Sequence, residues 1–259
     1  MTAAETYRPV VARAARWEDE ACRHLLVWRA GPGWRMVSSA VLGGGIGERG
    51  WVLNAQVRPG YGRMDPAEHL AELAAAQGLT GPGVGLMTAA QVDDGTWAED
   101  GGVTAVVTTG IGVPAWAAEP AAPALVPAGR YVPGTINILA VVPAAVADAG
   151  LVNLLATATE AKVQALLDAG YDCSGTPSDA VCVAVRTAGP GGEVDPFGGP
   201  RSTWGARLAR AVHAAVLAGA ERDRARRAAG PPRDHAAVRS TCCHADVLGP
   251  PGARSCGHE

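Results

Sequence analysis

The sequence predicts an α+β fold, in which mixed or antiparallel sheet layers are covered by helices within a single domain. Short runs rich in Val, Leu and Trp alternate with turns rich in Gly and Pro, which is typical of strands. Longer segments carry apolar residues at helical spacing and end at glycine. Because 48% of the 259 residues are hydrophobic and 18% are charged, the chain can bury a core.

The strands are expected where β-branched and aromatic residues cluster between turns. In the early part of the chain, GPG and GGGIGERG turns separate three such runs. The Pro- and Ala-rich residues 112 to 133 predict a loop. The expected strands lie within residues 25 to 57 and at 84 to 90, 103 to 111, 135 to 142 and 179 to 186.

Three helices are expected between and after these strands. The first begins at Asp65, has Pro66 in its first turn and ends at Gly78, which is the usual order of start and stop residues. The second spans 144 to 169, and Ser202 caps the third.

Large apolar residues vanish after the third helix, while charge, Pro and Gly increase. We therefore place the folded domain at residues 1 to 222 and a flexible tail, rich in Arg, Pro and Cys, at 223 to 259. The cysteines and histidines of the tail match no zinc-binding spacing, so no metal site is expected there.

The net charge of −3 argues against a nucleic-acid partner, which would need a basic surface. The N-terminal residues lack the apolar core of a signal peptide. The most apolar stretches are broken by Gly or Pro before they reach the ~20 residues of a membrane helix. We expect a cytoplasmic protein that binds neither nucleic acid nor membrane, and a homo-oligomer is left open.

The chain contains 21 arginines but one lysine, Lys162. On a helical wheel of about 100° per residue, Lys162 falls at the centre of the apolar stripe of the second helix, and Glu160 falls on the opposite, polar face. Such a lysine either extends its ammonium group past an apolar stem to water, or enters a cleft where a carboxylate holds it. The rarity of lysine in this chain favours a functional role, and both interpretations stay open.

Polar side chains recur where the predicted strands end or meet glycine turns, which is where rigid folds often present chemistry. Taken singly, each hydroxyl is more typical of a turn. The chain lacks the common phosphate-binding, zinc-protease and serine-hydrolase motifs, but a hydroxyl, a lysine and an acid suffice for amide hydrolysis. The candidates are Ser38, Ser39, Asn54, Thr88, Thr108, Thr109, Thr135, Asn137, Thr176, Ser178 and Asp179.

Seven segments are specific in combination, above all TEAK followed by GTPSD and GGPRS. They are SSAVLGGG (38 to 45) with Asn54, GLMTAA (85 to 90), VVTTGI (106 to 111), GTINILAVV (134 to 142), TATEAKVQALLDAG (157 to 170), GTPSDAVCVA (175 to 184) and FGGPRSTWG (197 to 205). In this order they resemble the adenosylcobinamide amidohydrolases (the CbiZ family) of cobamide salvage.

The resemblance implies hydrolysis of the amide that joins the aminopropanol arm to a propionate of the corrin ring, giving adenosylcobyric acid. It implies no required cofactor, because the small-molecule corrinoid is the substrate. It also implies that residues of the matching segments contact this substrate. Those residues are Ser38, Ser39, Asn54, Thr88, Thr108, Thr176, Gly198 and Gly199.

The strand at 134 to 142, with the helix and strand after it, is also similar to the ornithine acetyltransferases and DmpA-type aminopeptidases. In those families a Thr or Ser at the start of a strand is the nucleophile, so the similarity implies a related fold and this role for Thr135. We hypothesise that Thr135 attacks the amide or orients a water, and that Lys162 takes its proton or stabilises the oxyanion. Asp179 would then hold Lys162.

Asn137 would bind the developing oxyanion together with backbone N–H groups. Glu160 is a weaker catalytic candidate, because it faces away from Lys162 on the wheel. Three other functions stay open: a corrinoid-binding module without turnover, an amidase for a different amide, and a metal-dependent enzyme that uses the Cys/His-containing tail.

Overall fold

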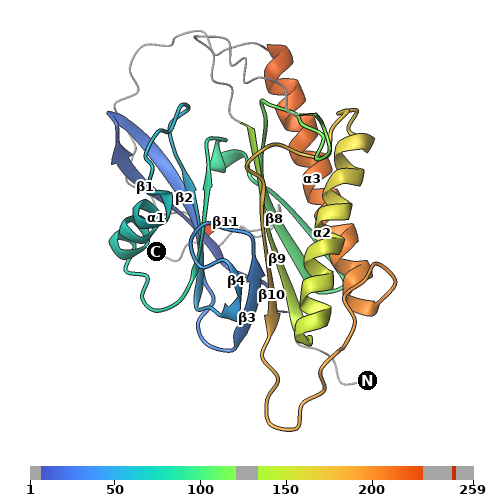
Figure 1. The fold of residues 1–259 in the computed structure, drawn as a ribbon. Coiled ribbons are helices and arrows are strands. Elements are labelled where there is room, and N and C mark those ends of the chain that lie inside the picture. Colours follow the sequence, from blue (N-terminus) through green and yellow to red (C-terminus); the bar gives the residue numbers. More distant parts are fainter. Residues whose placement is uncertain (1–6, 121–133, 230–246, 249–259) are drawn as a thin grey trace, which may run out of the picture.

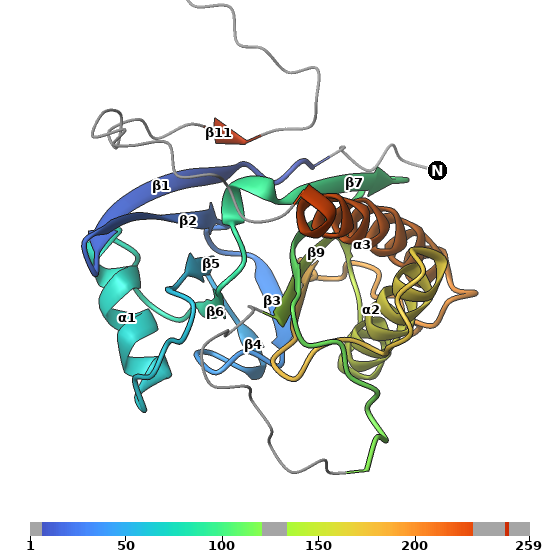
Figure 2. The same ribbon diagram turned by 90° about the horizontal axis from the view of Figure 1, so that it is seen from above.

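Two mixed β-sheets face each other at the centre of the protein (Figures 1 and 2). The computed structural model describes residues 7–120, 134–229 and 247–248. The first sheet runs in the order β11 (Val247–Leu248), β1 (Val11–Glu18), β2 (Ala21–Arg29), β5 (Trp51–Gln56) and β6 (Val84–Thr88). The second sheet runs in the order β4 (Gly45–Glu48), β3 (Trp34–Ser38), β10 (Ala180–Arg186), β9 (Gly134–Ala145), β8 (Val103–Ile111) and β7 (Thr96–Asp100).

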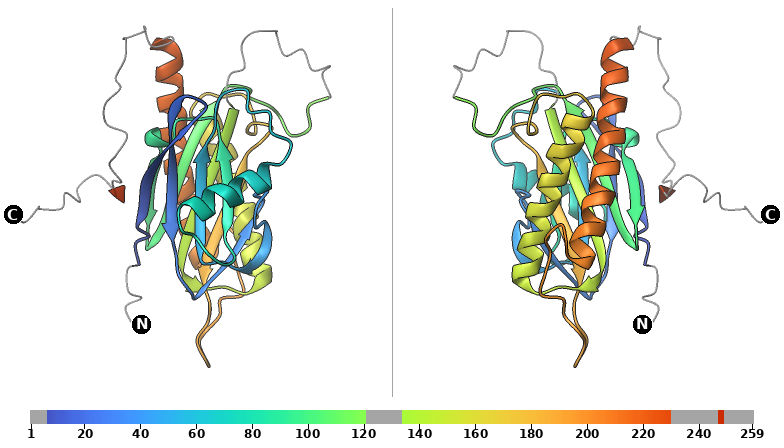
Figure 3. Two further views of the ribbon diagram at one scale, coloured as in Figure 1. Left: turned by 90° about the vertical axis from the view of Figure 1, so that its left-hand side faces the viewer. Right: turned by 90° about the vertical axis from the view of Figure 1, so that its right-hand side faces the viewer.

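Helices cover the outer face of each sheet, so the chain forms four layers (Figure 2). The helix α1 (Pro66–Ala76) lies on the first sheet. The helices α2 (Asp148–Asp168) and α3 (Thr203–Ala229) lie side by side on the second sheet (Figure 3). None of the described helices is long and apolar enough to cross a membrane.

Three apolar clusters fill the spaces between the layers. Leu53 and Leu70 belong to the cluster between the first sheet and α1. Trp28 and Trp34 belong to the cluster between the two sheets, where their ring centroids are 5.0 Å apart. Leu154 belongs to the largest cluster, between the second sheet and the two long helices. Each interface buries apolar side chains from both of its layers, which stabilises the stack.

Two pairs of neighbouring strands are parallel, β5 with β6 and β9 with β10. A helix joins each pair, because parallel strands require a long connection. Val57 follows β5 and Thr88 ends β6, whereas Thr135 begins β9 and Asp179 precedes β10. Since all four residues line one cavity, the carboxyl ends of the first pair meet the amino ends of the second.

The predicted α+β class, with mixed sheets covered by helices, is confirmed. The structure differs at the start of the second helix, because β9 continues through Pro143 to Ala145 and α2 begins at Asp148. Pro143 lies beyond Val141, where pairing with β8 ends, and faces an irregularity in the pairing with β10. A proline without an N–H is tolerated at such a position.

Four strands have no counterpart in the sequence prediction: β1, β7, β4, which lies in the expected GGGIGERG turn, and β11, which lies in the expected tail. The helix α3 continues past residue 222, where the sequence predicts the end of the domain, to Ala229, and Asp223 is buried. Part of the expected loop (121 to 133) and most of the expected tail (230 to 246 and 249 to 259) lie outside the described residues. The domain boundary at residue 222 stays a prediction.

Candidate active site

A cavity of about 450 Å³ lies where the two parallel strand pairs meet. Both sheets and the loop before α1 contribute to its wall, which combines apolar side chains with hydroxyl groups. Polar groups that converge in an apolar cavity are typical of a small-molecule site. The polar side chains at this wall are Ser39, Tyr61, Arg63, Thr88, Thr135, Ser178 and Asp179.

Two hydroxyl groups form a close pair in the cavity wall. Oγ1 of Thr135 lies 2.6 Å from Oγ of Ser178. Each hydroxyl can also donate to the carbonyl oxygen of Gly134, at 2.8 Å from Thr135 and 2.9 Å from Ser178. Because two hydrogens serve three contacts, one hydroxyl donates to the other while the second donates to Gly134.

The predicted contact between Lys162 and Asp179 is present behind this pair. Nζ of Lys162 lies 2.5 Å from Oδ2 of Asp179, and the two side chains are 8% and 10% exposed. The backbone N–H of Thr176 donates to Oδ2, and its hydroxyl donates to Oδ1. The backbone N–H of Ile136 also donates to Oδ1, at 2.9 Å. The carboxylate therefore joins α2, the start of β9 and the loop before β10.

Gly175 leaves the space in which this ion pair sits. A Cβ atom at this position would lie 2.2 Å from Oδ2 of Asp179 and 2.5 Å from Nζ of Lys162. Both distances are far shorter than a van der Waals contact, so any larger residue would push the two charged groups apart. The glycine at the start of GTPSDA therefore belongs to the site, although no feature of the sequence distinguishes it from the many other glycines of the chain.

Asn137 bridges the two sheets instead of facing the cavity. Its Nδ2 donates to Oδ1 of Asn54 at 2.9 Å and to the carbonyl oxygen of Met87 at 3.0 Å. Asn54 in turn donates to the hydroxyl of Thr108, at 2.9 Å. Since both amide hydrogens of Asn137 are engaged, it has none to offer an oxyanion. The structure thus places Asn54, Thr108 and Asn137 in a buried polar bridge.

Ser38, the last residue of β3, and Ser39, which follows it, bind the neighbouring strand β10 through their hydroxyls. The hydroxyl of Ser38 donates to the carbonyl oxygen of Val181, and Oγ of Ser39 accepts the N–H of the same residue. On the opposite wall, Oγ1 of Thr88 accepts the N–H of Ala90 at 3.0 Å. Ser39 and Thr88 border the cavity, as the resemblance implies, whereas Ser38 lies just behind it.

Three further predicted site residues lie on or beside the two long helices, away from this cavity. Glu160 is exposed on the outer face of α2. Gly198 packs against α2, and a Cβ atom there would lie 2.0 Å from the carbonyl oxygen of Gly150. Gly199 lies against Gly205 of α3: a Cβ atom at Gly205 would lie 2.0 Å from the carbonyl oxygen of Gly199. The glycine pair therefore allows a loop to approach two helices closely.

Two polar residues that line the cavity, Tyr61 and Arg63, are not among the site residues that the sequence predicts. They lie in the loop between β5 and α1, and the signal that could have found them is the rarity of tyrosine, of which the chain has four. Burial raises the pKa of Tyr61 above its ordinary value. Burial also raises the pKa of Cys182 to about 12, so this thiol stays protonated between the sheets.

Within the described ranges, no group of three or more His, Cys, Asp and Glu side chains is placed to hold a metal ion. The polar groups that the structure does bring together are hydroxyls, one buried ion pair and backbone amides. Such a set can support acyl transfer, in which a hydroxyl attacks a carbonyl carbon.

Comparison with known proteins gives consistent matches along the chain. Residues 9–228 match the adenosylcobinamide amidohydrolase family. The adenosylcobinamide amidohydrolase of Methanosarcina mazei is 33% identical over 189 residues, which cover 71% of this chain and 88% of the relative. The adenosylcobinamide amidohydrolase of Halobacterium salinarum is 39% identical over 135 residues, which cover 51% of this chain and 56% of the relative.

Among solved structures, the PH0078 protein from Pyrococcus horikoshii OT3 has a TM-score of 0.40 and 11% identity, over 83% of this chain and 85% of that chain. A similarity this distant indicates no function. The family match and the Methanosarcina relative, in contrast, span most of the described residues. The chain belongs to the adenosylcobinamide amidohydrolase family.

Proposed function

We propose that this protein hydrolyses the amide bond between the aminopropanol arm and the corrin ring of adenosylcobinamide, giving adenosylcobyric acid and the free amino alcohol. The observation that carries the proposal is the pair of hydroxyls, Thr135 and Ser178, in a cavity wall that is anchored by a buried ion pair. Membership of the family, and the names of the two relatives, support the choice of substrate.

The size of the cavity indicates how much of the substrate enters. Its volume of about 450 Å³ is within the usual range for small-ligand sites, but a corrin ring with its substituents is larger. We expect the arm to enter while the ring rests at the mouth. Val41 lines the cavity and is 61% exposed, so it offers the ring an apolar contact there.

In the first step, Oγ1 of Thr135 forms a bond to the amide carbon, and the carbon–nitrogen bond breaks. The proton of Thr135 passes to Oγ of Ser178, 2.6 Å away, while Ser178 gives its own proton to the departing nitrogen. The neutral amine leaves, and an ester remains on Thr135. Ser178 thereby ends the step with one proton, as it began.

In the second step, water adds to the ester carbon, and the bond to Thr135 breaks. One proton of the water returns through Ser178 to Oγ1 of Thr135, and the carboxylic acid is released. The sum of both steps is one amide and one water converted into one acid and one amine. No co-reactant other than water is required.

Lys162 acts on these groups through Asp179. The carboxylate binds the N–H of Ile136, next to Thr135, and belongs to the residue next to Ser178. The ion pair thus fixes the separation of the two hydroxyls, which decides how readily a proton passes between them. Lys162 and Asp179 are positioning residues in this proposal.

The test is to incubate the purified protein with adenosylcobinamide and to follow cobyric acid by liquid chromatography and mass spectrometry. Thr135→Ala should lower turnover by about a thousandfold or more, because the nucleophile is lost. Thr135→Ser should retain turnover. Thr159→Ala is the matched control, because this hydroxyl is exposed on α2 and donates to the carbonyl oxygen of Leu155.

The ester gives a second readout. After an acid quench, the peptide that contains Thr135 should carry the mass of the corrinoid acyl group, and the Ala variant should not. Tight binding of the corrinoid without any product would instead indicate a binding module. Turnover of other amides, but not of adenosylcobinamide, would indicate a different amidase. Unchanged turnover in Thr135→Ala would refute the mechanism.

A further inference from the structure

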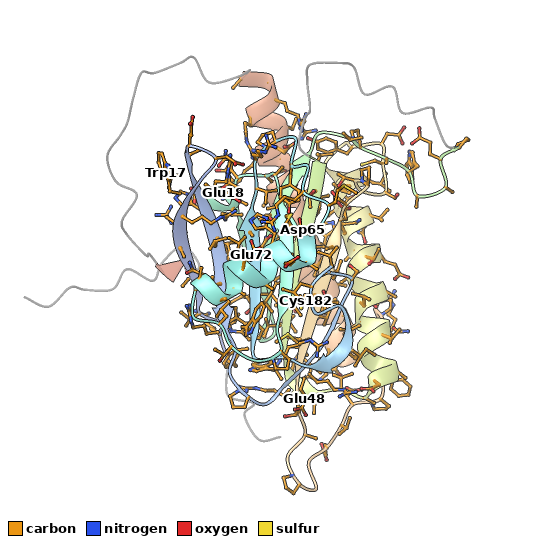
Figure 4. All side chains as sticks on the ribbon, turned by 60° about the vertical axis from the view of Figure 1, so that its left-hand side comes forward. Trp17, Glu18, Glu48, Asp65, Glu72 and Cys182 are labelled. Atoms are coloured by element: carbon orange, nitrogen blue, oxygen red, sulfur yellow. The ribbon has the colours of Figure 1, made fainter. Side chains whose placement is uncertain are left out.

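Tyr61 lies in the cavity wall and is backed by the buried side chain of His69 and the partly buried side chain of Glu18. Its hydroxyl oxygen is 3.0 Å from Nδ1 of His69, and Nε2 of His69 is 2.9 Å from Oε1 of Glu18. His69 is 3% exposed and belongs to α1. Glu18, which is labelled in Figure 4, ends β1. The mechanism proposed above uses none of these three residues.

The direction of the hydrogen bonds follows from what each group can donate. The second oxygen of Glu18 binds Arg16 at 2.5 Å, and a carboxylate only accepts, so Nε2 of His69 donates to it. When the imidazole is neutral, the other ring nitrogen accepts. Nδ1 of neutral His69 then accepts the hydrogen of the Tyr61 hydroxyl, which leaves the Tyr61 oxygen with lone pairs and no hydrogen to give.

The tyrosine ring is held independently of its hydroxyl. The rings of Tyr61 and His69 are stacked, with centroids 5.6 Å apart and an interplanar angle of 10°. Removing the hydroxyl should therefore leave the ring in place, so the oxygen can be tested on its own. Burial raises the pKa of Tyr61, which keeps the hydroxyl protonated near neutral pH.

Two other hydroxyls of the cavity, those of Ser39 and Thr88, have the opposite polarity. Oγ of Ser39 and Oγ1 of Thr88 each accept a backbone N–H, and neither donates a hydrogen bond within the part of the chain that the structure describes. Their hydrogens are thus available to carbonyl oxygens of a ligand. Tyr61 thus accepts a hydrogen bond, whereas Ser39 and Thr88 donate. A ligand that binds all three hydroxyls must present a donor to Tyr61 and acceptors to the other two, in a fixed order.

We infer that Tyr61 binds the substrate by accepting a hydrogen bond from a neutral N–H or O–H group of its aminopropanol arm. The inference rests on the proposed function, because it assigns the same cavity to the arm. The arm offers two such donors, the amide N–H and the hydroxyl. A carbonyl oxygen in the same place would face only lone pairs, so Tyr61 selects the orientation of the arm. His69 and Glu18 are positioning residues that set the polarity of Tyr61.

The experiment compares Tyr61→Phe with Tyr171→Phe. The control removes a hydroxyl that donates to Asp223 at 3.1 Å and does not line the cavity. With adenosylcobinamide at pH 8, Tyr61→Phe should raise KM by about three- to tenfold, the effect of one neutral hydrogen bond, with kcat and the melting temperature near wild type. Tyr171→Phe should leave KM unchanged.

A substrate analogue with a propylamine arm, which lacks the hydroxyl, identifies the donor. If the effect of Tyr61→Phe on KM vanishes with this analogue, Tyr61 binds the hydroxyl of the arm. If the effect persists, Tyr61 binds the amide N–H. As a single variant, His69→Leu should raise KM. In the Tyr61→Phe background it should raise KM no further, whereas structural damage caused by the leucine would raise KM in both backgrounds.

Binding measured by equilibrium dialysis in the Thr135→Ala background separates this inference from the proposed function. The inference is wrong if Tyr61→Phe changes neither the Kd for adenosylcobinamide nor KM. In that case the proposed function still holds, provided that the wild-type protein turns over the substrate. Absence of turnover in the wild-type protein refutes the proposed function instead, and the comparison of Kd values still decides the role of Tyr61.

Discussion

The single lysine of the chain can be buried because a carboxylate accompanies it. The helical wheel predicts Lys162 on the apolar stripe of its helix, and the side chain is indeed 8% exposed, next to Asp179. Of the two interpretations of such a lysine, the structure favours a held charge over a side chain that extends to water. Gly175 makes the arrangement possible, because it leaves room for both charged groups.

Removing both members of this pair should cost less than the two single removals added together. Lys162→Met leaves a buried, uncompensated carboxylate, and we expect the free energy of unfolding to fall by about 3–5 kcal/mol. Lys162→Met combined with Asp179→Asn should lose less than the sum of the single variants, because no lone charge remains. Urea denaturation of the three variants measures the coupling.

An exposed ion pair provides the control for these Lys162 and Asp179 variants. Arg210 binds Asp100 through two hydrogen bonds of 2.6 and 2.8 Å, but its side chain is 59% exposed. Arg210→Met should therefore change the free energy of unfolding by about 1 kcal/mol or less. Equal losses in Lys162→Met and Arg210→Met would show that burial adds nothing to the lysine pair.

The sequence predicts which residues belong to the site better than it predicts which residues they contact. The sequence selects Thr135, Lys162 and Asp179, because each is marked by a strand end, a rare residue type or a family motif. It could not assign the partner of Asn137, because that contact depends on how two sheets, joined by distant parts of the chain, face each other. The proximity of Ser178 to Thr135 depends on the same long-range geometry.

At the scale of elements, the loop before α3 is fitted closely to α2. Gly198→Ala would place a methyl group 2.0 Å from the carbonyl oxygen of Gly150 and 2.7 Å from the N of Leu154. We expect a loss of about 1–3 kcal/mol in the free energy of unfolding, as for other overpacked positions. Thermal denaturation measures the loss.

Gly189→Ala is the matched control for this substitution. A Cβ atom at Gly189 would have no heavy atom within 4 Å, so the change should stay within about 0.5 kcal/mol. If both alanine variants unfold alike, the close approach of the loop to α2 does not limit stability, and a direct role of Gly198 in substrate binding becomes the better explanation.

The elements that the sequence predicts are those with large apolar residues. β9 and α2 are recognisable because their Ile, Leu and Val residues face a buried cluster. β1 is not, because VARAARWE alternates small and basic residues and is only half buried over most of its length. The strand β1 is stabilised by pairing with β2. Neither the strand propensity of its residues nor the spacing of its apolar residues indicates that this pairing occurs.

At the scale of the whole molecule, a polar bridge crosses the apolar space between the sheets. Asn54→Ala would remove the acceptor for Asn137 and the donor for Thr108 at once. We expect the free energy of unfolding to fall by about 1–3 kcal/mol, because buried polar groups would lose their partners. Asn153→Ala, at an exposed position of α2, controls for the loss of an amide.

The same variant tests how the two sheets share the site. The cavity takes residues from both sheets, so a change in their separation should also raise KM in Asn54→Ala. If Asn54→Ala and Asn153→Ala unfold at the same urea concentration, the polar bridge does not stabilise the contact between the two sheets. The sequence predicts mixed sheet layers covered by helices, but it does not predict the bridge, since the bridge links residues that are far apart in sequence.

The tryptophans between the sheets give the molecule an internal optical reporter. Trp28 belongs to the first sheet and Trp34 to the second, both are 1% exposed, and their rings meet at 73°. Two indoles held at a fixed angle in a chiral core couple their electronic transitions, so near-ultraviolet circular dichroism reports the spacing of the layers directly. Any ligand that draws the sheets together should therefore be visible in this spectrum without an added label.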